Sequence, residues 1–134
     1  MALNVPTIGA QTLLRRALGD VATGNLLLKL YTNDVTPAEG DTVATYTVAS
    51  GNGYADKTLT DGSWTVTNAD PAVATYDSGA QVFTFTGALG NVYGYYITDA
   101  AGTTLMWSER FTGAPFNVQN NGDTITVTLQ LTLD

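Results

Sequence analysis

The chain has neither histidine nor cysteine among its 134 residues. It therefore cannot hold a Ser-His or Cys-His nucleophilic pair, a disulfide framework, or a zinc site built from imidazole and thiolate ligands. It also lacks a glycine-rich loop between a strand and a helix, the feature that cradles phosphates. We therefore expect no enzyme, with no catalytic residue, no cofactor and no metal ion.

Positive charge is also scarce, because five Lys and Arg residues face twelve Asp and Glu residues and give a net charge of −7. Phosphate binding needs clustered cations, so a nucleic-acid partner is not expected. The same acidity disfavours anionic lipid, and no apolar run reaches the roughly 18 residues of a membrane span, so no membrane partner is expected either. A weakly charged surface suits large contacts with other subunits.

The N-terminus carries no basic segment followed by an apolar core. A secretion signal would need both of these features. We therefore expect the chain to be made and folded in a cytoplasm.

The strongest structural signal is the strict alternation of apolar and polar residues over residues 123–134. The apolar positions are Ile125, Val127, Leu129, Leu131 and Leu133, and they alternate with Thr124, Thr126, Thr128, Gln130 and Thr132. A period of two predicts one long strand with a buried face and a wet face.

Other stretches between Gly, Asn and Asp turns also have strand-like composition. We expect further strands over residues 25–31, 43–48, 55–59, 63–67, 73–76, 81–86, 92–98 and 103–111. Residues 25–31 are apolar on both faces and predict a central strand. About eight strands predict an all-β fold, an antiparallel β-sandwich of jelly-roll type, in a single domain over residues 1–134.

Three finer expectations concern side chains within these strands. Phe83 and Phe85 should point inward, and Trp64 and Val66 should share one face. Gly94 should mark a bulge or a close backbone approach. Residues 99–102 should form a tight hairpin turn.

The only expected helix covers residues 7–20, within an N-terminal arm of residues 1–22 that precedes the sandwich of residues 23–134. The helix should begin at a Thr7 cap and stop at Gly19. Its apolar stripe consists of Leu13, Leu14, Ala17, Leu18 and Val21. The stripe can pack on the end of the sandwich, or the arm can dock on a neighbouring subunit through Leu13, Leu14, Arg15 and Arg16.

Carboxylates could run a glycosidase if two of them faced each other. The candidates are Glu39, Asp41, Asp56, Asp61, Asp70 and Glu109. Most of them lie in turns and are interpreted as solvated turn residues. Glu109 lies within an expected strand, and we interpret it as a partner of Arg110 or of a backbone amide.

Two loops are candidate contact surfaces, because loops on rigid scaffolds often carry function. Residues 32–41 contribute Asp34, Glu39 and Asp41, and residues 112–122 contribute Pro115 and Phe116. The first loop, with Asn33, has enough oxygens for Ca²⁺ but lacks EF-hand spacing, so we interpret it as an ordinary acidic loop.

Aromatic residues in the expected strands could stack on sugar rings. They are Trp64, Tyr93, Tyr95, Tyr96 and Trp107. Core packing is the alternative interpretation, and it is favoured for the two tryptophans. For the three tyrosines the choice stays open.

Several segments resemble a group of small tailed-bacteriophage proteins. The resemblance runs from about residue 25 to the C-terminus and is weaker in the helix. It is carried by LKLYTNDVTPAEGDTVATYT (28–47), GYADKTLT (53–60), SWTV (63–66), FTFTGALGNVYGYYITDAAGTTLMWSERF (83–111) and PFNVQNNGDTITVTLQLTL (115–133).

The resemblance implies a structural virion protein of the capsid cement or decoration kind, on the outer surface of a phage head. Such proteins often assemble as homotrimers, with the major capsid protein as partner. The alternative is a tail-associated β-module that binds a carbohydrate or a receptor. The motifs are turns and strands, so the resemblance transfers no functional residue.

Overall fold

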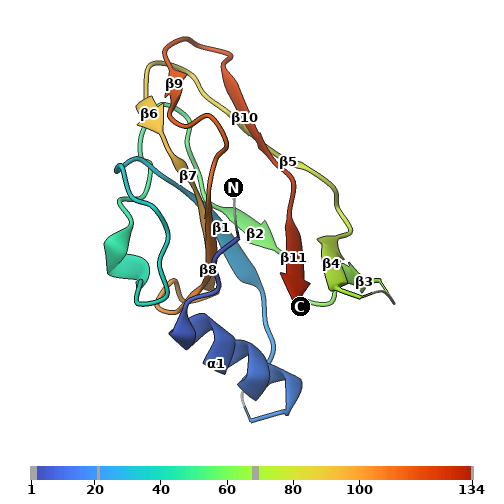
Figure 1. The fold of residues 1–134 in the computed structure, drawn as a ribbon. Helices are drawn as coiled ribbons and strands as arrows, with labels where there is room; N and C mark the ends of the chain where they lie inside the picture. The colour runs from blue at the N-terminus through green and yellow to red at the C-terminus, as the bar shows by residue number, and fades with distance from the viewer. Residues whose placement is uncertain (1–2, 21, 68–69, 134) are drawn as a thin grey trace.

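The computed structural model describes residues 3–20, 22–67 and 70–133, and these form an all-β fold with one N-terminal helix, as predicted (Figure 1). The elements are α1 (Thr7–Ala17), β1 (Leu26–Tyr31), the 3-10 helix η1 (Val43–Thr45), β2 (Lys57–Leu59), β3 (Trp64–Val66), β4 (Ala72–Tyr76), β5 (Gln81–Thr84), β6 (Gly90–Val92), β7 (Gly94–Asp99), β8 (Leu105–Arg110), β9 (Phe116–Val118), β10 (Thr124–Val127) and β11 (Gln130–Leu133).

The described strands pair antiparallel in four sheets, with the orders β2-β1-β7-β8, β11-β4-β3, β10-β5 and β6-β9. In the largest sheet β1 lies next to β7 in a register from Leu26 opposite Asp99 to Tyr31 opposite Gly94. The predicted central position of residues 25–31 is therefore confirmed. The described pairing is divided among more than two sheets, so the jelly-roll sandwich stays a prediction.

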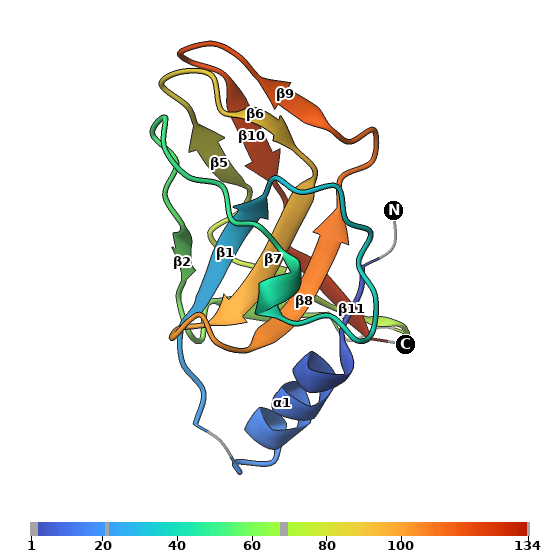
Figure 2. The same cartoon turned by 90° about the vertical axis from the view of Figure 1, so that its left-hand side faces the viewer.

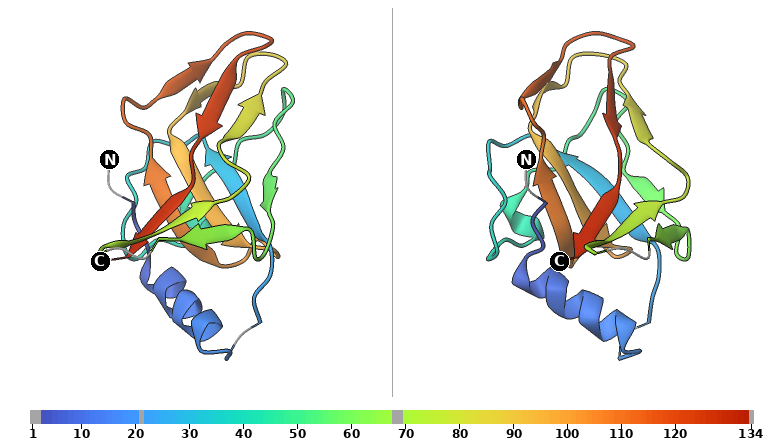
Figure 3. Two further views of the ribbon diagram at one scale, coloured as in Figure 1. Left: turned by 90° about the vertical axis from the view of Figure 1, so that its right-hand side faces the viewer. Right: turned by 45° about the vertical axis from the view of Figure 1, so that its right-hand side comes forward.

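The four-stranded sheet lies in the middle of the molecule and is covered on both faces (Figures 1 and 2). Strands β3, β4, β5, β10 and β11 lie on one face, and Figure 3 shows them from the front. The segment around η1 lies on the other face. α1 crosses one end of these layers, and the β6–β9 pair lies at the opposite end.

Each face of the middle sheet has its own apolar core. The larger core includes Leu28, Ile97 and Trp107 from the sheet, and Phe83, Phe85, Ile125, Val127 and Leu129 from the opposite layer. This confirms that Phe83 and Phe85 point inward. The smaller core consists of Tyr31, Tyr46, Tyr96 and Leu105, with Val35 and Val43 packed against it.

The expectation of a single strand over residues 123–134 is wrong, although its side-chain pattern is right. Ile125, Val127, Leu129 and Leu131 are all buried. The strand breaks before Gln130 because β10 pairs with β5, whereas β11 pairs with β4. The side chain of Leu133 and all of Asp134 lie outside the description.

Residues 43–48 are not a strand. The backbone N–H of Thr42 donates to Thr45 Oγ1 at 3.1 Å, and the Thr42 side chain accepts from the Thr45 N–H, so a capping box starts η1 instead. Only Val48 forms a β-bridge, to Tyr31. Residues 112–122 are more ordered than the expected loop, because they contain β9.

Trp64 and Val66 were expected on one face of a strand, but they differ in burial. Trp64 packs edge-on against Trp107 at a centroid distance of 6.0 Å. Val66 is 64% exposed, because β3 is an edge strand and only its first residue reaches the core.

Gly94 lies at a close approach, as predicted. A Cβ atom there would overlap the carbonyl oxygen of Glu109 and lie 2.6 Å from the Tyr31 hydroxyl oxygen. The hairpin at residues 99–102 is also confirmed, because the Gly102 N–H donates to the Asp99 carbonyl at 3.0 Å. Burial opposes ionisation of Asp99, but the backbone amides of Thr104 and Thr103 lower its pKa overall.

Replacing Leu129 by Asp should unfold the domain. Leu129 is 1% exposed at the crossing from β10 to β11, and an unpaired buried carboxylate is costly. We expect a loss of more than about 4 kcal/mol in the free energy of unfolding, measured by urea denaturation. The exposed neighbour provides the control, since Thr128→Asp should change stability by less than about 1 kcal/mol. A native-like Leu129→Asp protein would contradict this assignment of the buried face.

The smaller core should make the protein sensitive to alkaline pH. Burial raises the pKa of Tyr31 and of Tyr96 to about 12. Unfolded tyrosines lose their proton near pH 10, so between about pH 10 and pH 12 the unfolded state binds fewer protons. The free energy of unfolding should be flat below that window and fall as the pH rises through it. Denaturant titrations in steps of about one pH unit would measure this.

Tyr96→Phe provides the matched variant, because it removes one titrating hydroxyl and keeps the ring. The decline should become shallower in this variant. A native protein whose buried tyrosines all ionise near their ordinary pKa would contradict the expectation.

Candidate contact surface

A helix capped at Thr7 and running to Asp20 would start at Ile8, so α1 begins one residue earlier and ends three residues earlier than that. Pro6 occupies the cap position in an extended conformation, so Thr7 is the first helical residue and the predicted Thr7 cap is wrong. Gly19 adopts φ of 76°, and its N–H donates to the Arg16 carbonyl at 3.2 Å. The predicted stop at Gly19 is therefore confirmed.

The inner face of α1 is fixed by backbone contact with the middle sheet. Gly9 is buried, and a Cβ atom there would overlap the carbonyl oxygen of Met106 in β8. Just before the helix, the Asn4 N–H donates to the Ser108 carbonyl at 2.9 Å, and the Ser108 N–H donates back at 3.0 Å. These contacts set both the position and the rotation of the helix.

The predicted apolar stripe is divided between the two sides of α1. Leu13 is half-buried and packs against the larger core. Leu14 is 64% exposed and Leu18 is 83% exposed, so α1 packs on the end of the strands, as expected, through only part of the stripe. Each residue turns the helix by about 100°, and the rotation set by Gly9 directs Leu14 and Leu18 outward. Val21 lies outside the described residues.

The outer side of α1 carries an apolar groove with a volume of about 310 Å³. We call it the outer groove, and it is lined by Val5, Ala10, Leu13, Leu14 and Ala17. Arg15, near the end of α1, pairs through Nε with Asp20 Oδ2 at 2.7 Å. Both of these side chains are about 60% exposed, so the ion pair contributes little to stability.

A second cleft of about 210 Å³ lies between α1 and the strands. Its lining includes Leu13 and Arg16 from the helix, Leu26, Trp64 and Trp107 from strands, and Asp61. Among the described residues, neither Arg16 Nε nor Trp107 Nε1 has a hydrogen-bond partner, and both atoms are buried. Asp61 Oδ2 accepts from the Thr23 hydroxyl at 3.1 Å.

The acidic loop at residues 32–41 lies next to α1. The Thr7 N–H donates to the Glu39 carbonyl at 3.1 Å, while Asp34 Oδ1 pairs with Arg110 at 2.7 Å. Asp41 Oδ2 accepts from the Ala38 N–H at 2.8 Å and from the Tyr46 hydroxyl at 2.7 Å. Asp34 and Asp41 therefore hold the loop in place, and the side chain of Glu39 remains exposed.

The other predicted loop lies at the opposite end of the molecule (Figure 1). Pro115 is exposed, and Phe116 of β9 is 40% exposed and stacks on Phe111 at a centroid distance of 5.1 Å. The structure thus brings together the helix residues and the acidic loop, but not Pro115 and Phe116.

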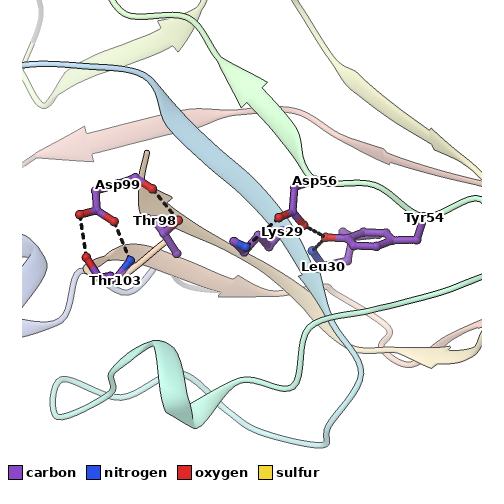
Figure 4. Close-up of polar contacts among 7 residues, drawn as sticks. All are labelled: Lys29, Leu30, Tyr54, Asp56, Thr98, Asp99 and Thr103. Carbon is purple, nitrogen blue, oxygen red and sulfur yellow. Dashed lines mark hydrogen bonds and ion pairs between the residues drawn. The ribbon is translucent and has the colours of Figure 1, made fainter. Parts of the chain in front are cut away.

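Several carboxylates form hydrogen bonds or ion pairs with other residues of the same chain. Figure 4 shows Asp56 between Lys29, whose Nζ lies 2.7 Å from Oδ2, and Tyr54, whose hydroxyl donates to Oδ1 at 2.8 Å. Glu109 accepts from the Tyr95 hydroxyl at 3.1 Å. The interpretation of Glu109 as a partner of Arg110 is wrong, because Arg110 reaches Asp34 instead.

The three tyrosines considered for sugar stacking are buried or covered by another side chain. Tyr95 and Tyr96 are buried in the larger and the smaller core, respectively. The Arg110 guanidinium covers the ring of Tyr93 at 5.1 Å from its centroid. A strand can bury both faces only when both are covered by other layers, and residues 94–99 meet that condition.

Within the described residues, no group of three or more Asp and Glu side chains is placed to hold a metal ion. No helix in the described part of the chain has the length and apolarity to cross a membrane. No protein-family model matches the chain, and no curated protein or solved structure matches it either.

Sequence reasoning missed Val5 and Ala10 as lining residues of the outer groove, whereas Ala17 was already placed on the apolar stripe. Ala10, Leu14 and Ala17 recur at helical spacing, and that signal was present. The second cleft left no such signal, because its lining comes from six separate parts of the chain.

Gly9→Ala should loosen α1 from the middle sheet. Ala normally favours a helix by about 1 kcal/mol, but here its methyl group would overlap the Met106 carbonyl, and overpacking costs about 1–3 kcal/mol. We expect lower stability and faster hydrogen exchange in α1. Gly40→Ala is the control, because its Cβ would meet nothing within 4 Å. A Gly9→Ala protein with unchanged exchange in α1 would contradict the close approach.

Proposed function

We propose that this chain is a non-enzymatic structural subunit of a phage virion that binds the outer surface of the head as a capsid cement or decoration protein. The observation that carries the proposal is the exposed apolar side of α1. Its partner would be the major capsid protein, and the chain would act as a homo-oligomer, with a trimer as the expected form.

The exposed side of α1 supports a role in contact, because it leaves hydrophobic surface uncovered in the isolated chain. Leu14 lines the outer groove and is 64% exposed, and Leu18, one turn further along α1, is 83% exposed. Covering one leucine side chain stabilises a contact by about 1.5–3 kcal/mol. Exposed apolar patches with polar surroundings are typical of protein interaction sites.

The assignment to a phage rests on the resemblance alone. The matched segments lie mainly in the strands. These segments supply β1, β7, β8 and β11, which build the cores. They therefore support a shared scaffold, whereas the contact surface proposed here lies on α1, where the resemblance is weakest.

A second candidate function is that of a tail-associated carbohydrate- or receptor-binding module, and an exposed aromatic ring at the end opposite α1 supports it. Phe116 presents a partly exposed ring there, stacked on Phe111. Flat aromatic rings are suitable platforms for sugar rings. A glycan array that shows binding lost on Phe116→Ala would favour this candidate.

The main proposal predicts that Leu14→Asp combined with Leu18→Asp weakens attachment to heads. Particles that lack this chain would be mixed with purified protein and sedimented. The parent should co-sediment, and the double variant should bind at least tenfold more weakly, since two buried leucines are lost. Val82→Asp is the matched control, because Val82 is an exposed apolar residue on β5, away from α1.

Virions purified free of this chain, with the protein found only in the lysate, would overturn the proposal. Electron cryo-microscopy of the virion separates the candidates. Density on the head would support the cement role, whereas density only on the tail would favour the second candidate.

A further inference from the structure

We propose that the second cleft, between α1 and the strands, binds a free α-amino acid with an apolar side chain. The carboxylate of the ligand meets Arg16, its ammonium group meets Asp61, and its side chain lies against the two tryptophans of the lining. This site goes beyond the proposed function, because its lining includes neither Leu14 nor Leu18.

Arg16 supplies the positive charge of the cleft. Its side chain lines the cleft, and its Nε atom is buried without a hydrogen-bond partner among the described residues. No ion pair in the described part of the chain includes Arg16, unlike its neighbour Arg15, which pairs with Asp20. A buried donor without an acceptor costs free energy, and a guanidinium pairs well with a planar carboxylate. The cleft therefore favours a ligand that carries a carboxylate.

Asp61 supplies the negative charge and is exposed. Its Oδ2 accepts from the Thr23 hydroxyl at 3.1 Å, and its backbone N–H donates to Asn25 Oδ1 at 2.9 Å. These bonds hold Asp61 against the segment that precedes β1. Asp61 forms no ion pair with Arg16 or with any other described residue. Both charges are therefore available to a ligand, and an ammonium group can donate to the Asp61 carboxylate.

The rest of the lining is mainly apolar and is already formed without a ligand. It consists of Leu13, Leu26, Trp64, Ala74, Trp107 and Leu131. Leu26, Trp107 and Leu131 are buried, and Leu13 packs against the larger core. Binding therefore requires little ordering of these side chains, which lowers its entropic cost.

The volume of the cleft limits the ligand. Its 210 Å³ is space for roughly seven water molecules at about 30 Å³ each. Leucine, isoleucine and valine are of this size, whereas a peptide would extend beyond the cleft. A purely apolar ligand would leave Arg16 without an acceptor, and a ligand with two negative charges would be repelled by Asp61.

Titration of the full chain with L-leucine tests the site. Trp64 and Trp107 are the only tryptophans in the sequence, and both line the cleft. Their fluorescence should therefore change and saturate as leucine binds, with a dissociation constant of about 1 mM or tighter, which calorimetry would measure independently. No saturable signal up to about 10 mM leucine, isoleucine or valine would overturn the proposal.

Paired changes in the ligand and the protein separate the two charged contacts. Isoamylamine is leucine without its carboxylate, and isocaproate is leucine without its ammonium group. Arg16→Gln should weaken leucine at least tenfold but change isoamylamine by less than about twofold, since that ligand has no partner for Arg16. Asp61→Asn should weaken leucine at least threefold and leave isocaproate unchanged. Its effect is smaller because Asp61 is exposed and its charge is screened.

Arg15→Gln and Asp70→Asn are the matched controls, because they remove the same charges from side chains that do not line the cleft. Both should bind leucine like the parent. An Arg16→Gln protein with the parent affinity would overturn the proposal. Equal binding of leucine and isoamylamine by the parent would do so as well, and that comparison needs no variant to fold.

Discussion

The rest of the structure depends on the burial of β7 on both faces. Tyr95 and Ile97 enter the larger core, and Tyr96 enters the smaller one. This arrangement requires a layer on each side of the middle sheet, which β5, β10 and β11 supply on one side and the η1 segment on the other. It also removes the central aromatic rings of β7 from the surface, so these rings are not available for contact with a partner.

α1 crosses one end of these layers, and its orientation follows from one glycine. Because Gly9 lies directly against β8, the helix cannot rotate to cover all of its leucines. Leu13 joins the core, while Leu14 and Leu18 are left in solvent. The exposed apolar surface is thus a consequence of the close backbone contact, and α1 remains firmly attached while it presents that surface.

The sequence predicted what depends on local geometry and missed what depends on distant partners. Alternation placed Ile125 and Leu131 inward correctly, because side-chain direction follows from the strand period alone. It could not show that the chain changes sheets between them, since that depends on β5 and β4. The stripe on the helix was correctly apolar, but only the contact of Gly9 with Met106 decides which leucines are covered. Residues 43–48 had strand-like composition, and the local capping box at Thr42 prevailed.

The placement of the uncovered apolar residues also limits unwanted association. A helix satisfies its own interior backbone hydrogen bonds, so Leu14 and Leu18 can be exposed without offering free backbone groups to another strand. The edge of β8 is partly closed by Asn4. β3 carries Val66 at an open edge of its described sheet, and carboxylates at Asp70 and Asp77 flank it. Negative charge discourages pairing with an identical edge, because like charges would meet.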